Sequence, residues 1–432
     1  MEGINLKKSK NISNYSQDDS VCYRSFLFIQ QIFLKIIGLL PWAVRTAGIF
    51  RKNGSVENGI FECDFSHAGS CYNILLFFFL VAFNIYIGNG ISSMETTSLS
   101  TLEIVLIELS FFTTLCISVI PLYYIIRQDL LIGVNIRLKN FDKKLNKCAD
   151  YKLDINNSNG VIFTVNFIMT GCILIIRQFY YKDLVKVLIV SFPYFVGSFV
   201  IVQYAMFLNI IKTRFKSINS TLSKLGTPKS KISLSRESVI GDIAVIKRAY
   251  VELCEICDDT ARFYGIPILV AIIILSMRDI FNLYLIISAI MGNGEFNVRL
   301  YQTGIFSVRN IFLFTVLTTY VTKIIKQVKL LCQSKYDFRP QAMIKIYLFV
   351  HYQYFQNEKT ATIISLIMDR YAMDDKIKEK LAKFSSDLWY LTVEFTACDI
   401  VPLDRTLLAV ITGTIATYLV IVVQFTARKS FN

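Results

Sequence analysis

The residues from Leu407 to Phe425 read LLAVITGTIATYLVIVVQF, and this stretch decides the fold class of the chain. A helix needs about 20 mostly apolar residues to cross the roughly 30 Å hydrocarbon core of a bilayer. This stretch has that length and carries no charge, but Thr417, Tyr418 and Gln424 add polar groups near its end. Polar groups in hydrocarbon need a partner helix, water or a pore to face. The sequence therefore predicts a membrane helix with a polar, functional side.

The composition of the whole chain extends this prediction. Among 432 residues, 54% are hydrophobic and only 18% are charged, with a mean hydropathy of +0.49. Soluble domains carry about 25% charged residues, so this composition excludes a soluble globular protein. We expect an all-α polytopic membrane protein with seven transmembrane helices. The expected spans are Cys71–Gly88, Glu103–Ile126, Val161–Ile176, Val187–Ile211, Gly265–Met291, Gly304–Thr322 and Arg405–Phe425.

The run Phe26–Trp42 is amphipathic rather than apolar on all sides. On a helix, Gln30, Gln31 and Lys35 line one side and apolar residues such as Ile29 line the other. No small-residue cleavage site follows, so the run does not have the features of a signal peptide. We expect an interfacial amphipathic helix that lies on the membrane surface.

The distribution of Lys and Arg predicts the orientation of the chain. The segments 1–70, 127–160, 212–264 and 323–404 hold 37 of the 46 basic residues, and the connections on the other side hold six. Positive residues stay on the cytoplasmic side of a membrane protein. The N-terminus is therefore expected to be cytoplasmic and the C-terminus extracellular. This places the net charge of +14 at the membrane and gives no reason to expect a nucleic-acid partner.

Long helical extensions are expected on the cytoplasmic side. The residues 212–222 continue the fourth span, and the residues 242–263 lead into the fifth. The segment Lys376–Asp399 has an apolar stripe at spacings of three or four residues, which predicts an amphipathic helix. Such a stripe needs a partner, either a neighbouring helix or another subunit.

The closing run resembles a signature of the insect gustatory receptors, in which Thr-Tyr, five hydrophobic residues and Gln-Phe end the last helix. The resemblance extends to other stretches of the chain. They are Gly38-Leu39-Leu40-Pro41, Gln203-Tyr204, Arg214-Phe215, Asn219 through Leu222, Phe395-Thr396-Ala397-Cys398-Asp399, Leu403-Asp404 and Leu407-Leu408.

Two stretches depart from the pattern of that family. The residues 336–357 are longer and more apolar than its usual connection between the sixth and seventh helices. They are an insertion, a gene-model artefact or a membrane-resting helix. Leu419 occupies the position where the sugar-receptor branch often has Glu, which favours fructose-type or bitter-type receptors.

The resemblance implies a ligand-gated, non-selective cation channel in the plasma membrane of gustatory neurons, in their dendrites, axons or cell bodies. The partners that it implies are a small-molecule tastant, the lipid bilayer, and other subunits in a homotetramer or a heteromer with other gustatory receptors. It implies a cytoplasmic N-terminus (1–70), a ligand-binding bundle of six helices (71–322), a cytoplasmic anchor (323–404) and a pore helix with an extracellular tail (405–432). No cofactor and no metal site is expected.

The pore residues that this resemblance implies are Thr417, Tyr418, Ile421, Gln424 and Phe425. On a helix, Thr417, Ile421 and Gln424 fall along one stripe, and Tyr418 and Phe425 share the adjacent face. A ring of Gln amides offers oxygen ligands to ions, and a ring of Phe closes a narrow pore by excluding water. The alternative is that these residues only hold helices together.

Ionisable residues inside spans are the candidates for a ligand site. Arg278, Asp279 and Asn282 lie in the fifth expected span, Arg309 in the sixth, and Tyr194 in the fourth. Arg278 and Asn282 share a helix face, while Asp279 points about 100° away and is free to pair with Arg309. Together they predict an aromatic-edged polar cavity that opens outward and binds a hydroxylated or alkaloid tastant. Internal salt bridges that fix the helix register are the alternative.

Three other classes of protein fit the sequence less well. A G-protein-coupled receptor has the opposite orientation, and the triplet Asp369-Arg370-Tyr371 lies between the sixth and seventh spans rather than after the third. A transporter would show internal repeats, which the chain lacks. An enzyme is not expected because His67 and His351 stand far apart and no nucleophile or phosphate-loop pattern occurs.

The predicted orientation is testable by glycosylation mapping, because only lumenal sequons receive glycans. We expect an engineered sequon after Phe425 to be modified and the five native sequons to stay unmodified. The native sequons begin at Asn11, Asn14, Asn53, Asn156 and Asn219. The opposite pattern of mobility shifts with and without glycosidase would refute the orientation.

Overall fold

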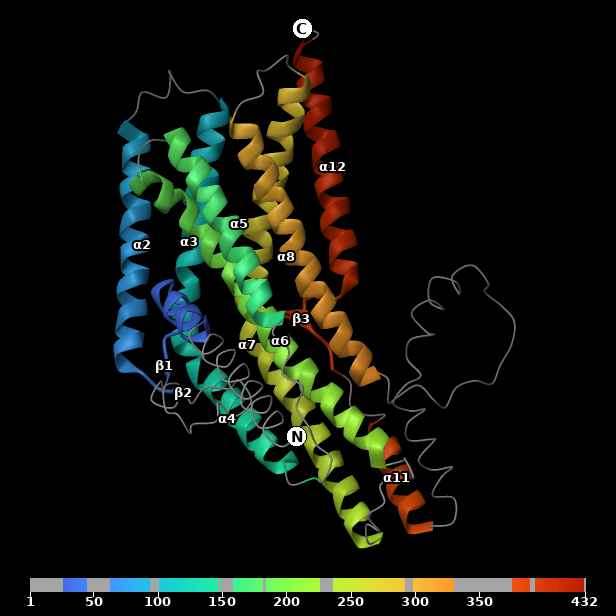
Figure 1. Ribbon diagram of the computed structural model, residues 1–432. Helices are drawn as coiled ribbons and strands as arrows, with labels where there is room; N and C mark the ends of the chain where they lie inside the picture. The colour runs from blue at the N-terminus through green and yellow to red at the C-terminus, as the bar shows by residue number, and fades with distance from the viewer. Residues whose placement is uncertain are drawn as a thin grey trace, which may run out of the picture.

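The computed structural model describes residues 26–44, 63–93, 101–146, 148, 158–181, 184–225, 236–291, 298–329, 375–388 and 393–430. These residues form an elongated bundle of helices with α2 (His67–Ser93) at one edge and α12 (Arg405–Ser430) at the other (Figure 1). The helices between them are α3 (Thr101–Ile126), α4 (Gln128–Leu145), α5 (Ser158–Tyr181), α6 (Leu184–Leu225), α7 (Arg236–Met291), α8 (Val298–Lys329) and α11 (Asp375–Leu388). A further short helix covers Phe26–Ile36.

Two small antiparallel hairpins connect the helices. The strands β1 (Ala43–Val44) and β2 (Cys63–Asp64) form the first, and β3 (Thr396–Ala397) and β4 (Val401–Pro402) form the second. The expected all-α membrane fold is confirmed, because helices dominate and the strands have only two residues each.

Within the described residues, five helices are long and apolar enough to cross a bilayer. They are His67–Tyr86, Ser158–Phe179, Val190–Leu222, Ile240–Ile287 and Thr303–Lys326. A sixth is obtained if α3 and α4, which meet at a bend of 56°, count as one span. The seventh expected span, Arg405–Phe425, lies in α12, whose described apolar part is shorter. The count of seven spans and the orientation of the termini remain predictions.

The expected helical extensions are continuous with the membrane helices. Helix α6 has 42 residues and α7 has 56, so α7 is about 80 Å long and exceeds the roughly 30 Å of hydrocarbon. The predicted helix Lys376–Asp399 is wrong in its second half. Helix α11 ends at Leu388, and Thr396 and Ala397 belong to β3. The stripe residue Phe395 is still buried, but it packs from an extended segment.

The segment from Phe26 to Trp42 packs one side of its helix against the bundle, and its position at the membrane surface stays a prediction. Its helix exposes apolar side chains such as Ile29, but Gln30, predicted on the outer polar side, is only 4% exposed. The Nε2 atom of Gln30 lies 3.3 Å from the Met206 sulfur. A chain reversal with Gly38 at a φ of 80° follows the helix. Helical periodicity could not predict this reversal, which buries the next four residues through Trp42.

Hydrogen bonds from side chains hold this buried reversal in place. The amide of Asn73 in α2 donates to the Gly38 carbonyl (2.8 Å), and the amide of Gln203 in α6 donates to the Leu39 carbonyl (3.1 Å). Tyr124 in α3 in turn donates to Gln203 Oε1 (2.8 Å). The three side chains satisfy carbonyls that neither a helix nor water would satisfy at this depth.

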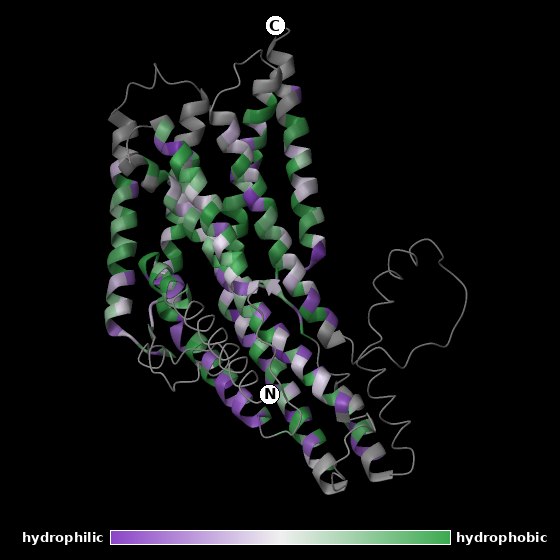
Figure 2. Cartoon of the chain, viewed as in Figure 1, coloured by the Kyte–Doolittle hydropathy of each residue, from purple (hydrophilic) through white to green (hydrophobic). Residues whose placement is uncertain are grey.

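Helix α6 forms the centre of the bundle. In its apolar window 83% of the residues are buried, compared with 28% in the windows of α2 and α5. It packs against α3, α5, α7 and α8. The exposed sides of the outer helices are apolar, as expected for surfaces that face lipid (Figure 2).

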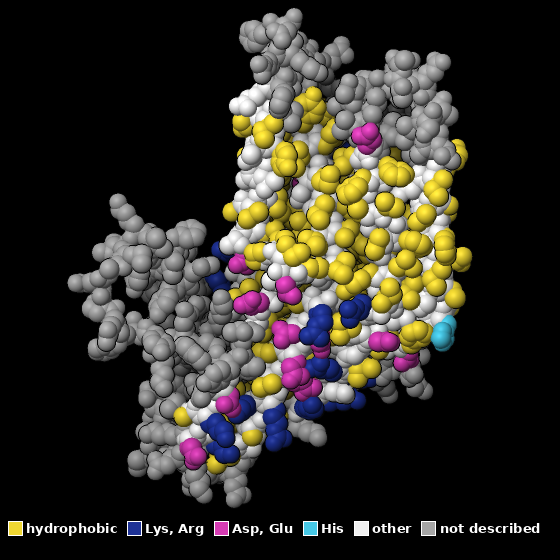
Figure 3. Space-filling model, turned by 180° about the vertical axis from the view of Figure 1, so that it is seen from behind, with side chains coloured by type: hydrophobic (Ala, Val, Ile, Leu, Met, Phe, Trp, Pro, Cys, Tyr) yellow, Lys and Arg dark blue, Asp and Glu magenta, His cyan; other side chains and the backbone are white. Residues whose placement is uncertain are grey.

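Charged side chains gather at one end of the molecule. Figure 3 shows a broad hydrophobic surface above and clustered basic and acidic side chains below. The charged end contains α4, α11 and the lower part of α7, which lie in the segments assigned to the cytoplasm from their Lys and Arg content (Figure 1). This arrangement is what the predicted orientation requires.

A buried ion pair joins α4 to α6 at this end. Arg214 donates from Nε (3.0 Å) and from an Nη atom (2.6 Å) to the two carboxylate oxygens of Asp142. A second Nη atom of Arg214 donates to the Ile210 carbonyl (3.0 Å). The side chains are 2% and 3% exposed, so the two charges depend on each other for solvation.

We expect Asp142→Ala to destabilise the protein by about 3–5 kcal/mol, because it leaves the buried Arg214 guanidinium unpaired. Thermal unfolding of the purified protein measures this loss. The matched control is Lys144→Gln, which breaks the more exposed pair with Glu252 (2.8 Å) and should cost less than about 1 kcal/mol. Equal effects of the two substitutions would show that the buried pair does not hold α4 on α6.

Candidate functional site

The five residues predicted for a ligand site come together in the interior of the bundle. Tyr194 comes from α6, Arg278, Asp279 and Asn282 from α7, and Arg309 from α8. All five side chains are less than 9% exposed. They lie in the half of the bundle away from the charged end, because α7 runs from that end to the opposite one (Figure 1). The expected outward opening of the cavity remains a prediction.

An asparagine links the acidic and basic residues of this site. The Asn310 amide donates to Asp279 Oδ1 (3.0 Å), and its oxygen accepts from an Nη atom of Arg309 (3.4 Å). A second Nη atom of Arg309 donates to Thr170 in α5 (3.4 Å). The expected direct pair between Asp279 and Arg309 is therefore replaced by an indirect one through Asn310. Because Arg309 and Asn310 are adjacent in the sequence, one turn of α8 supplies both the guanidinium and the amide that links it to Asp279.

Two aromatic rings and three guanidinium groups form the centre of the site, here called the arginine cluster. The rings of Tyr194 and Phe306 make an edge-to-face contact with centroids 5.4 Å apart. The guanidinium carbon of Arg278 lies 5.3 Å from the Tyr194 centroid, and that of Arg309 lies 4.4 Å from the Phe306 centroid. Arg177 approaches the Tyr194 ring at 5.9 Å. Cation–π attraction favours each of these contacts.

Several buried polar atoms of the arginine cluster, and one of Asn282 a turn beyond Arg278 on α7, have no hydrogen-bond partner among the described residues. They are Tyr194 Oη, Arg278 Nε, Asn282 Nδ2 and Arg309 Nε. A buried polar atom without a partner costs about 1–3 kcal/mol. Four such atoms in one place indicate a site that binds water or a ligand.

The sequence pointed to part of this cluster and missed the rest. Arg177 directly follows the third expected span, Val161–Ile176, and was not predicted as a site residue, but it is 1% exposed and donates to Ser191 Oγ (2.6 Å). Phe306 and Asn310 gave no signal as single residues, although Asn310 directly follows a predicted site residue. Two further ionisable residues, Glu103 and Glu108, begin the second expected span. Glu108 is exposed, and the side chain of Glu103 is outside the described residues.

Four of the predicted pore residues, Thr417, Tyr418, Ile421 and Gln424, have exposed side chains on α12. This helix packs on α7 and α8. Leu407 is buried, and Ile411 packs against the core. Thr417 and Gln424 are exposed, and they lie opposite Ile415 because each residue turns a helix by about 100°. Other α12 side chains near them are also uncovered.

The polarity of this uncovered side is mixed. Tyr418 is 52% exposed and Ile421 is 42% exposed. The Thr417 hydroxyl donates to the Gly413 carbonyl (2.9 Å), so its hydrogen is satisfied within the helix. Gln424 lies two turns further along α12 and places a side-chain amide on the same side of the helix. Phe425 lies in α12, but its side chain is outside the described residues.

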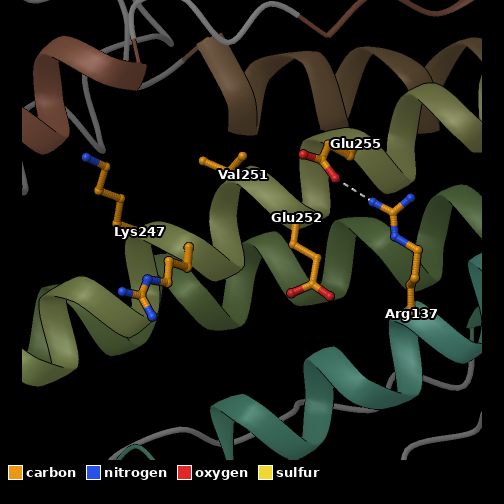
Figure 4. Close-up of a pocket in the computed structure, with 6 residues that line it drawn as sticks. Arg137, Lys247, Val251, Glu252 and Glu255 are labelled. Carbon is orange, nitrogen blue, oxygen red and sulfur yellow. Dashed lines mark hydrogen bonds and ion pairs between the residues drawn. The ribbon is translucent and has the colours of Figure 1, made fainter.

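A groove of about 430 Å³ lies between α4 and α7 at the charged end (Figure 4). Arg137 on α4 donates to Glu255 (2.6 Å) and to Asp259 (2.5 Å) on α7. Lys247 on α7 pairs with Asp387 on α11. These ion pairs join α4, α7 and α11 at the groove, and Arg248, which also lines it, has no ion pair to the other described residues.

The architecture defines a class of protein, a multi-pass α-helical membrane protein with a buried polar site and a partly uncovered last helix. A family model described as "7tm Chemosensory receptor" matches residues 30–427. The chain belongs to this family of chemosensory receptors. The resemblance to insect gustatory receptors drawn from the sequence is confirmed.

Relatives with related sequences come from Drosophila melanogaster. Putative gustatory receptor 28b is 38% identical over 77 residues, which cover 18% of this chain and 16% of the relative. Putative gustatory receptor 28a is 27% identical over 214 residues, which cover 49% of this chain and 41% of the relative. The matched segments thus span less than half the length of either relative.

Solved structures share the fold over almost the whole chain. The insect olfactory receptor OR5 from Machilis hrabei, in complex with eugenol, has a TM-score of 0.57 and 11% sequence identity. The match covers 94% of this chain and 100% of the receptor. A second structure of that receptor gives the same TM-score with 12% identity. At this identity the likeness shows the fold alone.

Proposed function

We propose that this chain is a subunit of a tastant-gated, non-selective cation channel in the plasma membrane of gustatory neurons. The tastants are sugars of the fructose type or bitter compounds. The observation that carries the proposal is the uncovered side of α12, where no helix among the described residues covers Thr417 and Gln424. An amide that faced hydrocarbon would be costly, so a water-filled pore or another subunit is the favourable surrounding.

Assembly of several copies would complete this arrangement. Four subunits, either identical or from different gustatory receptors, would place four α12 helices around a common axis. Gln424 amides and Phe425 rings would then form successive rings near the outer end of the pore. Amide oxygens would replace part of the hydration shell of a cation, and the aromatic ring would close the pore by excluding water.

The arginine cluster supports ligand gating of this channel. It combines buried polar atoms without partners and aromatic walls, which are the components of a small-molecule site. Arg278 and Asp279 lie on α7, and α7 also packs on α12. A ligand that shifted α7 would therefore act on the proposed pore helix through a direct packing contact.

Expression in oocytes with a panel of sugars and bitter compounds tests the proposal. We expect a tastant-evoked cation current that persists when G-protein signalling is blocked. Gln424→Ala should lower the calcium-to-sodium permeability ratio, because calcium depends more strongly than sodium on oxygen ligands. Reversal potentials in bi-ionic solutions measure this ratio.

The matched control is Ile415→Val, which lies on the packed side of the same helix and should leave the ratio unchanged. Surface labelling confirms equal amounts of each variant at the membrane. An unchanged ratio in Gln424→Ala would remove Gln424 from the pore. A surface-expressed receptor that gives no current with any tastant, alone or with other gustatory receptors, would contradict the channel.

A further inference from the structure

The arginine cluster carries more positive than negative charge. Arg278 and Arg309 bring two guanidinium groups, and Asp279 brings one carboxylate, which already accepts from Asn310. Arg278 has no ion pair or hydrogen bond to the other described residues; three aromatic faces surround its guanidinium, and the Asp279 carboxylate acts on it only at longer range. A buried cation without an anionic partner is costly, so the site favours an anion.

The position of Arg278 along α7 prevents its charge from reaching water at the end of the bundle. Arg278 stands thirteen residues before the end of the helix at Met291, which is about 20 Å along its axis. That distance exceeds the reach of an arginine side chain, so the guanidinium does not snorkel to the outer surface. With 8% exposure, its charge must be balanced where it lies.

The surroundings of Arg278 also define the rest of the ligand. Phe281, Phe306 and Tyr194 each present a ring within 6 Å of its guanidinium carbon. These rings give the ligand an apolar wall, and the Asn282 amide and the Tyr194 hydroxyl give it polar contacts. A planar guanidinium binds a carboxylate through two parallel hydrogen bonds.

We propose that the arginine cluster binds a small ligand that carries one carboxylate on an apolar body. One carboxylate balances the excess charge of Arg278 and Arg309 over Asp279. A cationic alkaloid would meet like charges here, and a neutral sugar would leave the charge unbalanced. This inference rests on the proposed function, because it concerns the ligand of the same site, and it narrows the proposed tastants to bitter compounds that carry a carboxylate, in place of sugars and cationic alkaloids.

Three probes with the same body and different charge test the inference without any substitution. They are 3-phenylpropanoate, its methyl ester and 3-phenylpropylamine, each titrated at neutral pH into the full-length receptor in lipid nanodiscs. We expect the carboxylate to bind at least about tenfold more tightly than the ester, and the amine to bind more weakly than the ester. Equal or tighter binding of the ester or the amine would overturn the proposal. Failure of all three probes to bind at millimolar concentration would also overturn it.

Substitutions at Arg278 locate the binding of the carboxylate. Arg278→Gln should weaken it by about tenfold to a hundredfold, and Arg278→Lys should restore part of the loss because the charge returns without the planar fork. The matched control is Arg262→Gln on the same helix, whose side chain is 66% exposed near the charged end. Unchanged affinity in a folded Arg278→Gln receptor would overturn the proposal.

The outcomes also separate this inference from the channel itself. Binding of the carboxylate without any evoked current would support the anion-binding site and contradict the proposed gating. The opposite outcome is a current that neutral tastants evoke, that Arg278→Gln leaves unaltered and that the carboxylate does not affect. It would support the proposed channel and contradict the anion-binding site.

Discussion

Hydrocarbon accepts and donates no hydrogen bonds, so every polar group in the apolar bundle must find its partner within the protein or in enclosed water. This constraint explains the helices, which satisfy their own backbone, and the few polar side chains between them. Asn73 and Gln203 satisfy the buried carbonyls of the N-terminal reversal. Arg214 and Asp142 satisfy each other, and Asn310 mediates between Asp279 and Arg309.

The same constraint marks the places where function is expected. Most buried polar groups that have partners hold helices in register, whereas Arg278 and the Tyr194 hydroxyl remain without hydrogen-bond partners in the described part of the bundle. Helix α12 presents a second exception, because Thr417 and Gln424 turn away from the bundle that the helix packs on. A ligand would complete the first place and neighbouring subunits the second. Helix α7 connects them, since it carries Arg278 and packs on α12.

The fold class follows from the sequence because membrane helices depend on composition and length, which are properties of single segments. The five residues of the predicted ligand site also came together, because ionisable residues in apolar spans have few places to go other than the interior. The rest depended on packing between distant segments. The burial of Gln30, the role of Asn310 as a bridge and the end of α11 at Leu388 are set by neighbours that periodicity does not show. The bend between α3 and α4, by contrast, falls where the second expected span ends at Ile126 and the polar helix α4 begins.

The central claim is that the uncovered side of α12 lines a water-filled pore, and cysteine accessibility tests it most directly. Thr417→Cys and Leu419→Cys differ by two positions and place thiols on different sides of the helix. A small cationic thiol reagent applied from outside during tastant stimulation should block the current of Thr417→Cys and spare that of Leu419→Cys. Equal reaction at both positions, or protection of Thr417→Cys while current flows, would contradict the account.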